Sequence, residues 1–262
     1  MGGIRHVAIV VPARDEATGI ELALAAIARA RCRIGPLSTT TVVVVDSRTD
    51  GSVDIVRRWC GGSRRHVEFV VAAAVGNVGA ARALGTRLAL AATLHGPRHV
   101  WLANTDADSE VPETWLVDQL EMAEQGAGAV AGLVERGDGA ARSVDDVVRR
   151  RSRIDGPDRH CHVHGANFGV RGDAYQRCGG WQPITAGEDH DLWHRLRRNG
   201  EKVVTSTSLA VRTNARTAPV AATGREPARV VHDRGASDRG ARPVLRSIAG
   251  RHQPDEPART SS

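Results

Sequence analysis

The sequence predicts an α/β fold with a mainly parallel central sheet flanked by helices. Strand-length apolar runs alternate along the chain with stretches in which apolar residues recur at helical spacing, and this alternation is typical of βαβ units. The first two strand candidates, 7–11 and 41–45, are nearly continuous β-branched runs, as in strands buried on both faces. Acidic side chains follow several predicted strands, at the sheet edge where open α/β folds bind their ligands.

The predicted elements follow one another in a regular order. Residues 16–31 place Ile20, Leu24 and Ile27 on one helical stripe. Pro112 suits the first position of a helix, because an amide there would have no intrahelical partner. The remaining predictions are strands at 67–72, 99–103 and 129–134, a strand-like stretch at 162–170, helices at 79–94, 113–125, 144–154 and 188–198, and a surface loop at 135–142.

Composition excludes several classes of protein. The chain has 262 residues, of which 41% are hydrophobic and 25% charged, so it is neither a disordered chain nor a disulfide mini-scaffold. The four cysteines are widely spaced and include no Cys-x-x-Cys pair, so we expect free thiols and a cytoplasmic location. No apolar run approaches the ~20 residues of a membrane span, so we expect no transmembrane segment, although peripheral contact with a membrane stays open.

The positive charge is concentrated at the C-terminal end. The net charge is +6, and residues 212–262 hold ten Arg against five acids, which leaves the preceding residues almost neutral. We predict one domain over 5–215 and a poorly ordered tail, rich in Arg, Pro and Gly, over 218–262. Aromatic residues make up only 3%, too few for a base-stacking platform, so we expect no nucleic-acid partner. One alternative function, outside the enzymes, is a protein that binds nucleic acid through this basic tail.

Several nucleotide motifs are absent, and the acids at strand ends remain. The sequence contains no Gly-x-Gly-x-x-Gly after a strand, no P-loop and no Gly-x-Ser-x-Gly, and Lys202 is its only lysine. Asp106 and Asp108 follow a predicted strand and are separated by the single residue Ala107, so both can bind one divalent cation together with a diphosphate. Their hard oxygen ligands suit Mg²⁺ or Mn²⁺.

Five sequence strings follow one another in a fixed order: Val7–Glu16, Val44–Asp46 with Asp50–Ser52, Asn77–Arg82, Asp106–Asp108 and Gly187–Leu192. Together they resemble the family 2 glycosyltransferases of the GT-A fold. The resemblance covers about residues 5–215, and His164–Phe168 and Cys178–Trp181 are similar to the family's segment before its catalytic acid. It implies a nucleotide-sugar-binding half at 5–108 and an acceptor-binding half at 109–215. The implied reaction is metal-dependent, inverting transfer of a hexose from a nucleoside-diphosphate sugar to a hydroxyl acceptor.

The resemblance also implies roles for single positions. Asp189 matches the catalytic base of inverting members, with Glu188 beside it as a catalytic candidate, and such a base would take the acceptor proton opposite the leaving group. Without the family pattern, Glu188, Asp189 and Asp191 are equally typical of a helix N-terminus. The other matches are Pro12, Ala13, Glu16, Asp46, Arg82 and Asp106 for the nucleotide, Asp106 and Asp108 for the metal, and His164, Asn167 and Trp181 for the acceptor and sugar pocket.

Other interpretations stay open. Arg149–Arg151 form either a solvated helix face or a contact to an anionic acceptor or lipid head group. Cys161, His162 and His164 lack the second ligand pair of a zinc site, and His232 in the tail is a candidate distal metal ligand.

The rival enzyme is a sugar-phosphate nucleotidyltransferase, but residues 12–16 contain neither the Gly nor the Lys that its phosphate loop needs. After Asp46 the chain departs from the family's Asp-Asp-Gly-Ser loop, so the nucleotide base stays open. The acceptor is either a small molecule or lipid-linked.

Overall fold

The computed structural model describes residues 3–46, 50–60, 66–136, 162–213 and 229–231. The predicted helix at 144–154 lies outside these residues, as do Arg149–Arg151, Cys161, His232 and most of the predicted tail.

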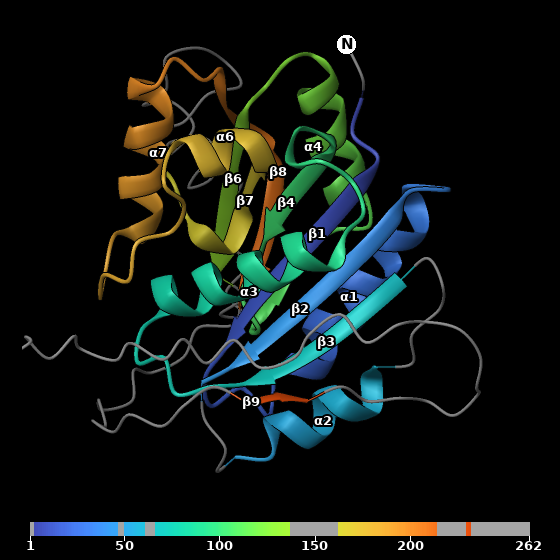
Figure 1. Ribbon diagram of the computed structural model, residues 1–262. Helices are drawn as coiled ribbons and strands as arrows, with labels where there is room; N and C mark the ends of the chain where they lie inside the picture. Colours follow the sequence, from blue (N-terminus) through green and yellow to red (C-terminus); the bar gives the residue numbers. More distant parts are fainter. Residues whose placement is uncertain (1–2, 47–49, 61–65, 137–161, 214–228, 232–262) are drawn as a thin grey trace, which may run out of the picture.

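The described strands form one nine-stranded sheet in the order β5-β8-β6-β7-β4-β1-β2-β3-β9 (Figure 1). Strands β4, β1, β2 and β3 are parallel neighbours, which confirms the parallel core that the β-branched runs predict. Four pairs of the described strands are antiparallel: β7 with β4, β7 with β6, β5 with β8, and β9 with β3. Their bounds are β1 His6–Ala13, β2 Ser38–Val45, β3 His66–Ala72, β4 Val100–Asn104, β5 Ser109–Glu110, β6 Ala129–Arg136, β7 Phe168–Arg171, β8 Val203–Thr213 and β9 Arg229–Val231.

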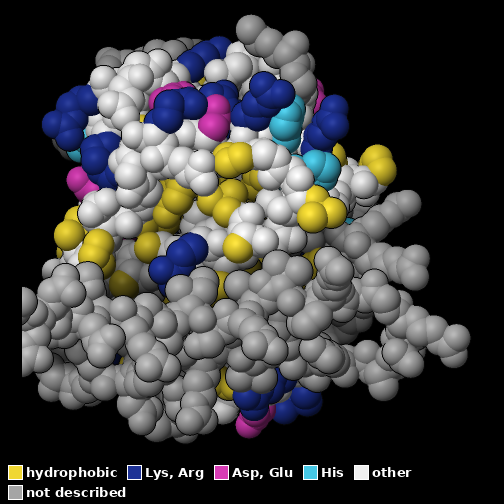
Figure 2. Space-filling view, in the orientation of Figure 1, with side chains coloured by type: hydrophobic (Ala, Val, Ile, Leu, Met, Phe, Trp, Pro, Cys, Tyr) yellow, Lys and Arg dark blue, Asp and Glu magenta, His cyan; other side chains and the backbone are white. Residues whose placement is uncertain are grey.

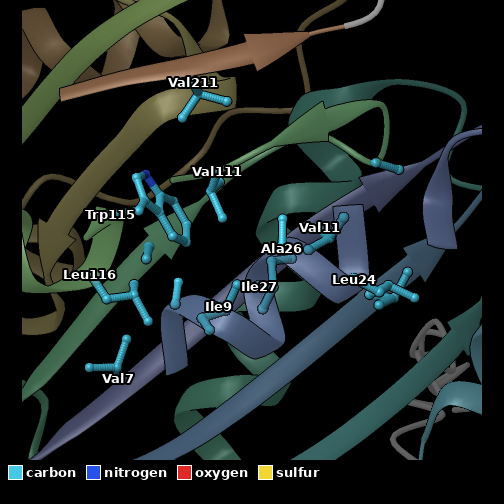
Figure 3. Packing of buried hydrophobic residues seen from close by; sticks show 14 of the residues in the cluster. Val7, Ile9, Val11, Leu24, Ala26, Ile27, Val111, Trp115, Leu116 and Val211 are labelled. Carbon is cyan, nitrogen blue, oxygen red and sulfur yellow. The ribbon is translucent and has the colours of Figure 1, made fainter. Parts of the chain in front are cut away.

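Helices cover both faces of the sheet. On one face, Val7, Ile9 and Val11 of β1 pack against Leu24 and Ile27 of α1, as Figure 3 shows from close by. The intervening Ala8, with Val42 and Val44 of β2, faces the second core, beneath α3, α6 and α7. The helices are α1 Ile20–Arg33, α2 Ser52–Trp59, α3 Val78–Ala92, α4 Trp115–Glu124, α6 Gly172–Arg177 and α7 Glu188–Arg198. Burial on both faces explains why β1 and β2 carry apolar runs without polar alternation.

Several boundaries differ from the predictions for local reasons. α4 begins at Trp115, not at Pro112, whose carbonyl instead accepts the N–H of Trp115. The strand predicted at 162–170 begins only at Phe168, because residues 165–167 form a single 3-10 turn. The sequence pattern predicts no element at the positions of α2 and β8. α2 starts after Gly51, which has a φ of 81°.

Acidic and basic side chains pair on part of the described surface. Figure 2 shows basic and acidic side chains side by side over the end of the molecule formed by α6 and α7. There Arg177 pairs with Asp173 at 2.8 Å and with Glu201 at 2.5 Å, and Arg171 pairs with Asp173. This agrees with the near-neutral charge of the sequence before residue 212. Among the described helices, none has the length and apolar character to cross a membrane.

Candidate active site

The carboxyl ends of β1, β2 and β4 meet at a cavity of about 200 Å³. Three connecting segments and the first turn of α3 form its wall. Its lining residues are Pro12, Ala13, Arg14 and Glu16 after β1, Asp46 after β2, Asn77, Val78 and Ala81 at the start of α3, and Asp106, Ala107 and Asp108 after β4. The structure therefore gathers most of the predicted donor-side residues around one space. What each of them contacts in a ligand stays a prediction.

Asp46 holds the loop that leads from β3 into α3. Its Oδ1 accepts the backbone N–H of Val75 at 2.7 Å, and its Oδ2 accepts the N–H of Gly76 at 3.1 Å. Gly76 has a φ of 78°, a conformation that glycine adopts without strain. The half-buried carboxylate thus fixes the backbone just before Asn77, on the rim of the cavity.

Asn77, the first residue of one of the strings that resemble the family, is a cavity residue to which the sequence assigns no role. Its Oδ1 accepts the N–H of Ala80 at 2.7 Å, so it is the N-cap of α3. Its Nδ2 donates to the carbonyl of Pro183 at 3.4 Å, which connects the start of α3 to the loop before α7. An Asn directly before a helical stretch is a recognisable capping signal, but nothing local indicates that it also lines a cavity.

Asp106 and Asp108 form the acidic side of the cavity. Burial raises the pKa of Asp108, and the neighbouring Asp106 carboxylate raises it further, against hydrogen bonds from Thr213 and Ser109. Two carboxylates that repel each other in a partly desolvated space suit a hard divalent cation. The described residues contain no group of three potential metal ligands.

Arg82 of α3 lies behind the cavity, not in its wall. Its Nη2 donates to Oδ1 of Asp106 at 2.6 Å, and its Nη1 donates to the carboxylate of Glu188. The side chains of Arg82 and Glu188 are 2% and 7% exposed. Since the described cavity is lined on α3 by Val78 and Ala81, Arg82 approaches it only through Asp106.

Asp189 lies in the first turn of α7, directly after Glu188. Its Oδ2 accepts the backbone N–H of Gly165 at 3.0 Å, and its Oδ1 accepts the N–H of His190 at 2.7 Å. His164 is near this carboxylate. Partial desolvation lowers the pKa of His164, and the negative charge of Asp189 opposes that shift.

Asn167 and Trp181, predicted in the sugar pocket, are core residues in the structure. Asn167 is 0% exposed. Its Oδ1 accepts the indole N–H of Trp115 at 3.0 Å, and its Nδ2 donates to the carbonyls of Leu133 and Leu209. Burial satisfies this amide through long-range partners that a single sequence does not identify.

Trp181 is 3% exposed and belongs to the second core. Its ring packs on Phe168, with centroids 5.2 Å apart, and lies 5.4 Å from the Arg82 guanidinium carbon. It therefore packs behind the site. A contact of Asn167 or Trp181 with a sugar stays a prediction.

The sequence matches a known family over most of the described fold. The model of the family described as "Glycosyl transferase family 2" matches residues 8–169. The chain belongs to this family. No curated protein matches the chain.

Solved structures with nucleotide sugars resemble this family 2 chain in fold. Residues 1–349 of S. aureus TarS, in complex with UDP-GlcNAc, are 14% identical with a TM-score of 0.62, and the match covers 81% of this chain and 59% of that one. The mannosyltransferase PcManGT from Pyrobaculum calidifontis, in complex with GDP-Man and Mn²⁺, is 22% identical with a TM-score of 0.59 and coverages of 80% and 57%.

GalNAc-T7 with UDP, GalNAc and Mn²⁺ is 14% identical with a TM-score of 0.61. That match covers 81% of this chain and 44% of GalNAc-T7. This family 2 chain therefore spans about three-fifths or less of the length of these structures, and at such identities the likeness concerns the fold.

Proposed function

We propose that the chain transfers a hexose from a nucleoside-diphosphate sugar to an acceptor hydroxyl, with inversion at the sugar carbon and with Mg²⁺ or Mn²⁺. The observation that carries the proposal is the ionic connection from Asp106, in the cavity wall, through Arg82 to Glu188, which directly precedes Asp189. A leaving-group site and a candidate base are thereby held at one edge of the sheet. Residues 5–108 form the donor half and 109–215 the acceptor half.

On the donor side, the nucleotide occupies the cavity between Pro12, Ala13, Glu16 and Asp46. Asp108 and Asp106 would hold a bound cation, and its positive charge would offset the charge of the departing diphosphate. Both carboxylates line the cavity, and the pKa of Asp108 is raised first by burial and then by repulsion from Asp106, both of which a bound cation would offset.

On the acceptor side, Asp189 is the general base. Two backbone N–H groups donate to its carboxylate and limit its rotation, which supports a role as a positioned base. The proton of the acceptor hydroxyl passes to Asp189 as the oxygen bonds to the sugar carbon and the nucleoside diphosphate leaves. His164 lies near the base, where it contacts the acceptor or sugar. The acceptor itself is a small molecule or a lipid-linked hydroxyl, taken up by a cytoplasmic or peripheral membrane enzyme.

Calorimetric titration tests the donor half. UDP-glucose and GDP-mannose represent the two nucleotide classes carried by the similar structures, and each is titrated with Mn²⁺ and again with EDTA. We expect one of them to bind only with metal, and Asp108→Asn to abolish that binding. The control is Glu113→Gln, an exposed acid outside the cavity. Failure of every nucleotide sugar to bind the folded protein would refute the proposal.

Water in place of the acceptor tests the reaction itself. The donor that binds is incubated with the protein, and proton NMR follows the sugar released by slow hydrolysis. Inversion requires that the first-formed sugar has the opposite anomeric configuration to the donor. Release of the same anomer would exclude the inverting mechanism while leaving the donor site intact.

A further inference from the structure

We propose that Arg82 is a positioning residue that couples the donor side of the site to the catalytic base, and not a contact to the nucleotide. This inference rests on the proposed function. It adds that Arg82 keeps the donor half and the acceptor half of the site aligned. It also replaces the sequence-based assignment of Arg82 to the nucleotide.

The guanidinium of Arg82 bridges two acids that are far apart in the sequence. Nη2 donates to Asp106 at 2.6 Å and Nη1 donates to Glu188, so one rigid plane holds both carboxylates. The Arg82 side chain is 2% exposed, and its two partners come from the segment after β4 and the first residue of α7. A planar fork with separate donors can fix two acceptors at once, whereas the single ammonium of Lys cannot reproduce that geometry.

The protein is built closely around this guanidinium. A Cβ added at Gly165 would overlap Cζ, Nη1 and Nη2 of Arg82, so only glycine lets the backbone approach so closely. The Trp181 ring lies 5.4 Å from Cζ and contributes a cation–π contact. The guanidinium is thus enclosed between a backbone segment and an indole ring.

Gly165 also connects Arg82 to the base. The residue whose backbone lies against the guanidinium donates its N–H to Oδ2 of Asp189 at 3.0 Å. Arg82 therefore influences Asp189 by two routes, through Glu188 in the same helical turn and through the hydrogen bond from Gly165. Both routes end at the carboxylate, and neither passes through the described cavity.

The consequence is a separation of binding from turnover. Without Arg82 the nucleotide would still find Asp46 and Asp108, which Arg82 does not hold, in the cavity wall. The base, however, would lose its register relative to the donor, and displacement of a catalytic group by about 1 Å costs on the order of 100-fold in rate. A direct nucleotide ligand would show the opposite pattern, with weakened binding.

The test combines three variants of the full chain. Arg82→Lys keeps the charge but not the fork. Arg82→Met with Glu188→Gln removes the cation together with its buried partner, which avoids leaving an unpaired carboxylate in the core. Gly165→Ala drives a methyl group against the guanidinium without changing either charge. Arg87→Lys, an exposed arginine on the same helix, is the control.

Two readouts are compared for each folded variant, the Kd of the Mn²⁺–nucleotide complex and the kcat of donor hydrolysis. We expect all three variants to keep Kd within about threefold while kcat falls by about 100-fold, and Arg87→Lys to match the wild type. Near-ultraviolet circular dichroism and the melting temperature identify any variant that is unfolded at the assay temperature.

Different results would contradict the proposed function of the chain and the positioning role of Arg82. A wild-type protein that binds and hydrolyses no nucleotide sugar would refute the proposed function, and the positioning role with it. An active wild type whose Arg82 variants lose nucleotide affinity at least tenfold would show that Arg82 contacts the donor, and would overturn the positioning role alone. Unchanged kcat in the folded variants would overturn it as well.

Discussion

The backbone N–H of Gly165 donates to Oδ2 of Asp189 at 3.0 Å. The other oxygen of that carboxylate accepts the N–H of His190 at 2.7 Å. Both oxygens are thus held by main-chain groups of separate segments, the turn at 165–167 and the first turn of α7. Among the described residues Asp189 forms no ion pair with Lys or Arg, so these two main-chain N–H groups are what orients its carboxylate there.

Asp189→Asn is expected to lower kcat by about 10²- to 10⁴-fold, because an amide cannot take the proton of the attacking hydroxyl. The Kd of the metal–nucleotide complex should stay close to that of the wild type, since Asp189 is not among the described cavity residues. Steady-state kinetics and calorimetry on the same preparation measure both. The matched control is Asp191→Asn, two residues after Asp189 on α7, which removes the ion-pair partner of Arg195. Equal losses in both variants would mean that helix integrity, not the base, is being measured.

Asp46→Ala is expected to release the loop before α3. The carboxylate accepts the N–H groups of Val75 and Gly76, and without it these amides lose their described acceptor. Hydrogen exchange at these two residues should accelerate, while exchange in the middle of α3 stays slow. Nucleotide affinity should fall with it, because Asn77 at the end of this loop lines the cavity. Unchanged exchange at both amides would show that the loop does not depend on Asp46.

The parallel core and the acidic cavity were predictable from the sequence because their signals are local. A buried strand such as β1 requires a continuous apolar run, and the acids that follow β4 come to the cavity through the parallel arrangement of the sheet. β8 escaped prediction because Ser206 and Thr207 are polar yet buried, which weakens the apolar pattern of that strand.

The connections within the site were not predictable, since they join residues far apart in the chain. Arg82 and Glu188 are separated by 106 positions, and no local pattern indicates their pairing. The side chains of Asn167 and Trp181 suit a sugar pocket as well as they suit the protein core. Only their packing against Trp115 and Phe168 shows that these two residues lie in the core.

Stability should decline in mild acid because of His6. Burial, with a contribution from the nearby His95, lowers the pKa of His6 from 6.5 to about 4. Between about pH 6.5 and pH 4, His6 is therefore protonated in the unfolded chain but neutral in the folded chain. The unfolding free energy therefore falls across that window, by at most about 3 kcal/mol.

Urea unfolding at pH 7 and pH 4.5 measures the loss, with His6→Gln as the comparison. Gln does not titrate and can still hydrogen-bond with Ser38 or Thr40, the partners of the imidazole. The variant should lose less stability than the wild type between the two pH values. A pH dependence identical in both proteins would assign the acid sensitivity to other groups.

Asn167→Ala is expected to damage the fold and not the donor site. The change removes the described acceptor for the indole N–H of Trp115 and the donor to the carbonyls of Leu133 and Leu209. Each buried polar group left without a partner costs about 1–3 kcal/mol, so the unfolding free energy should fall by several kcal/mol. Urea denaturation measures this loss, and Asn167→Ser provides a milder variant if the alanine form does not fold. In the folded fraction the KM for the donor should remain that of the wild type, because the amide is fully buried. A raised KM with unchanged stability would instead place Asn167 at the substrate, as the resemblance to the family implies.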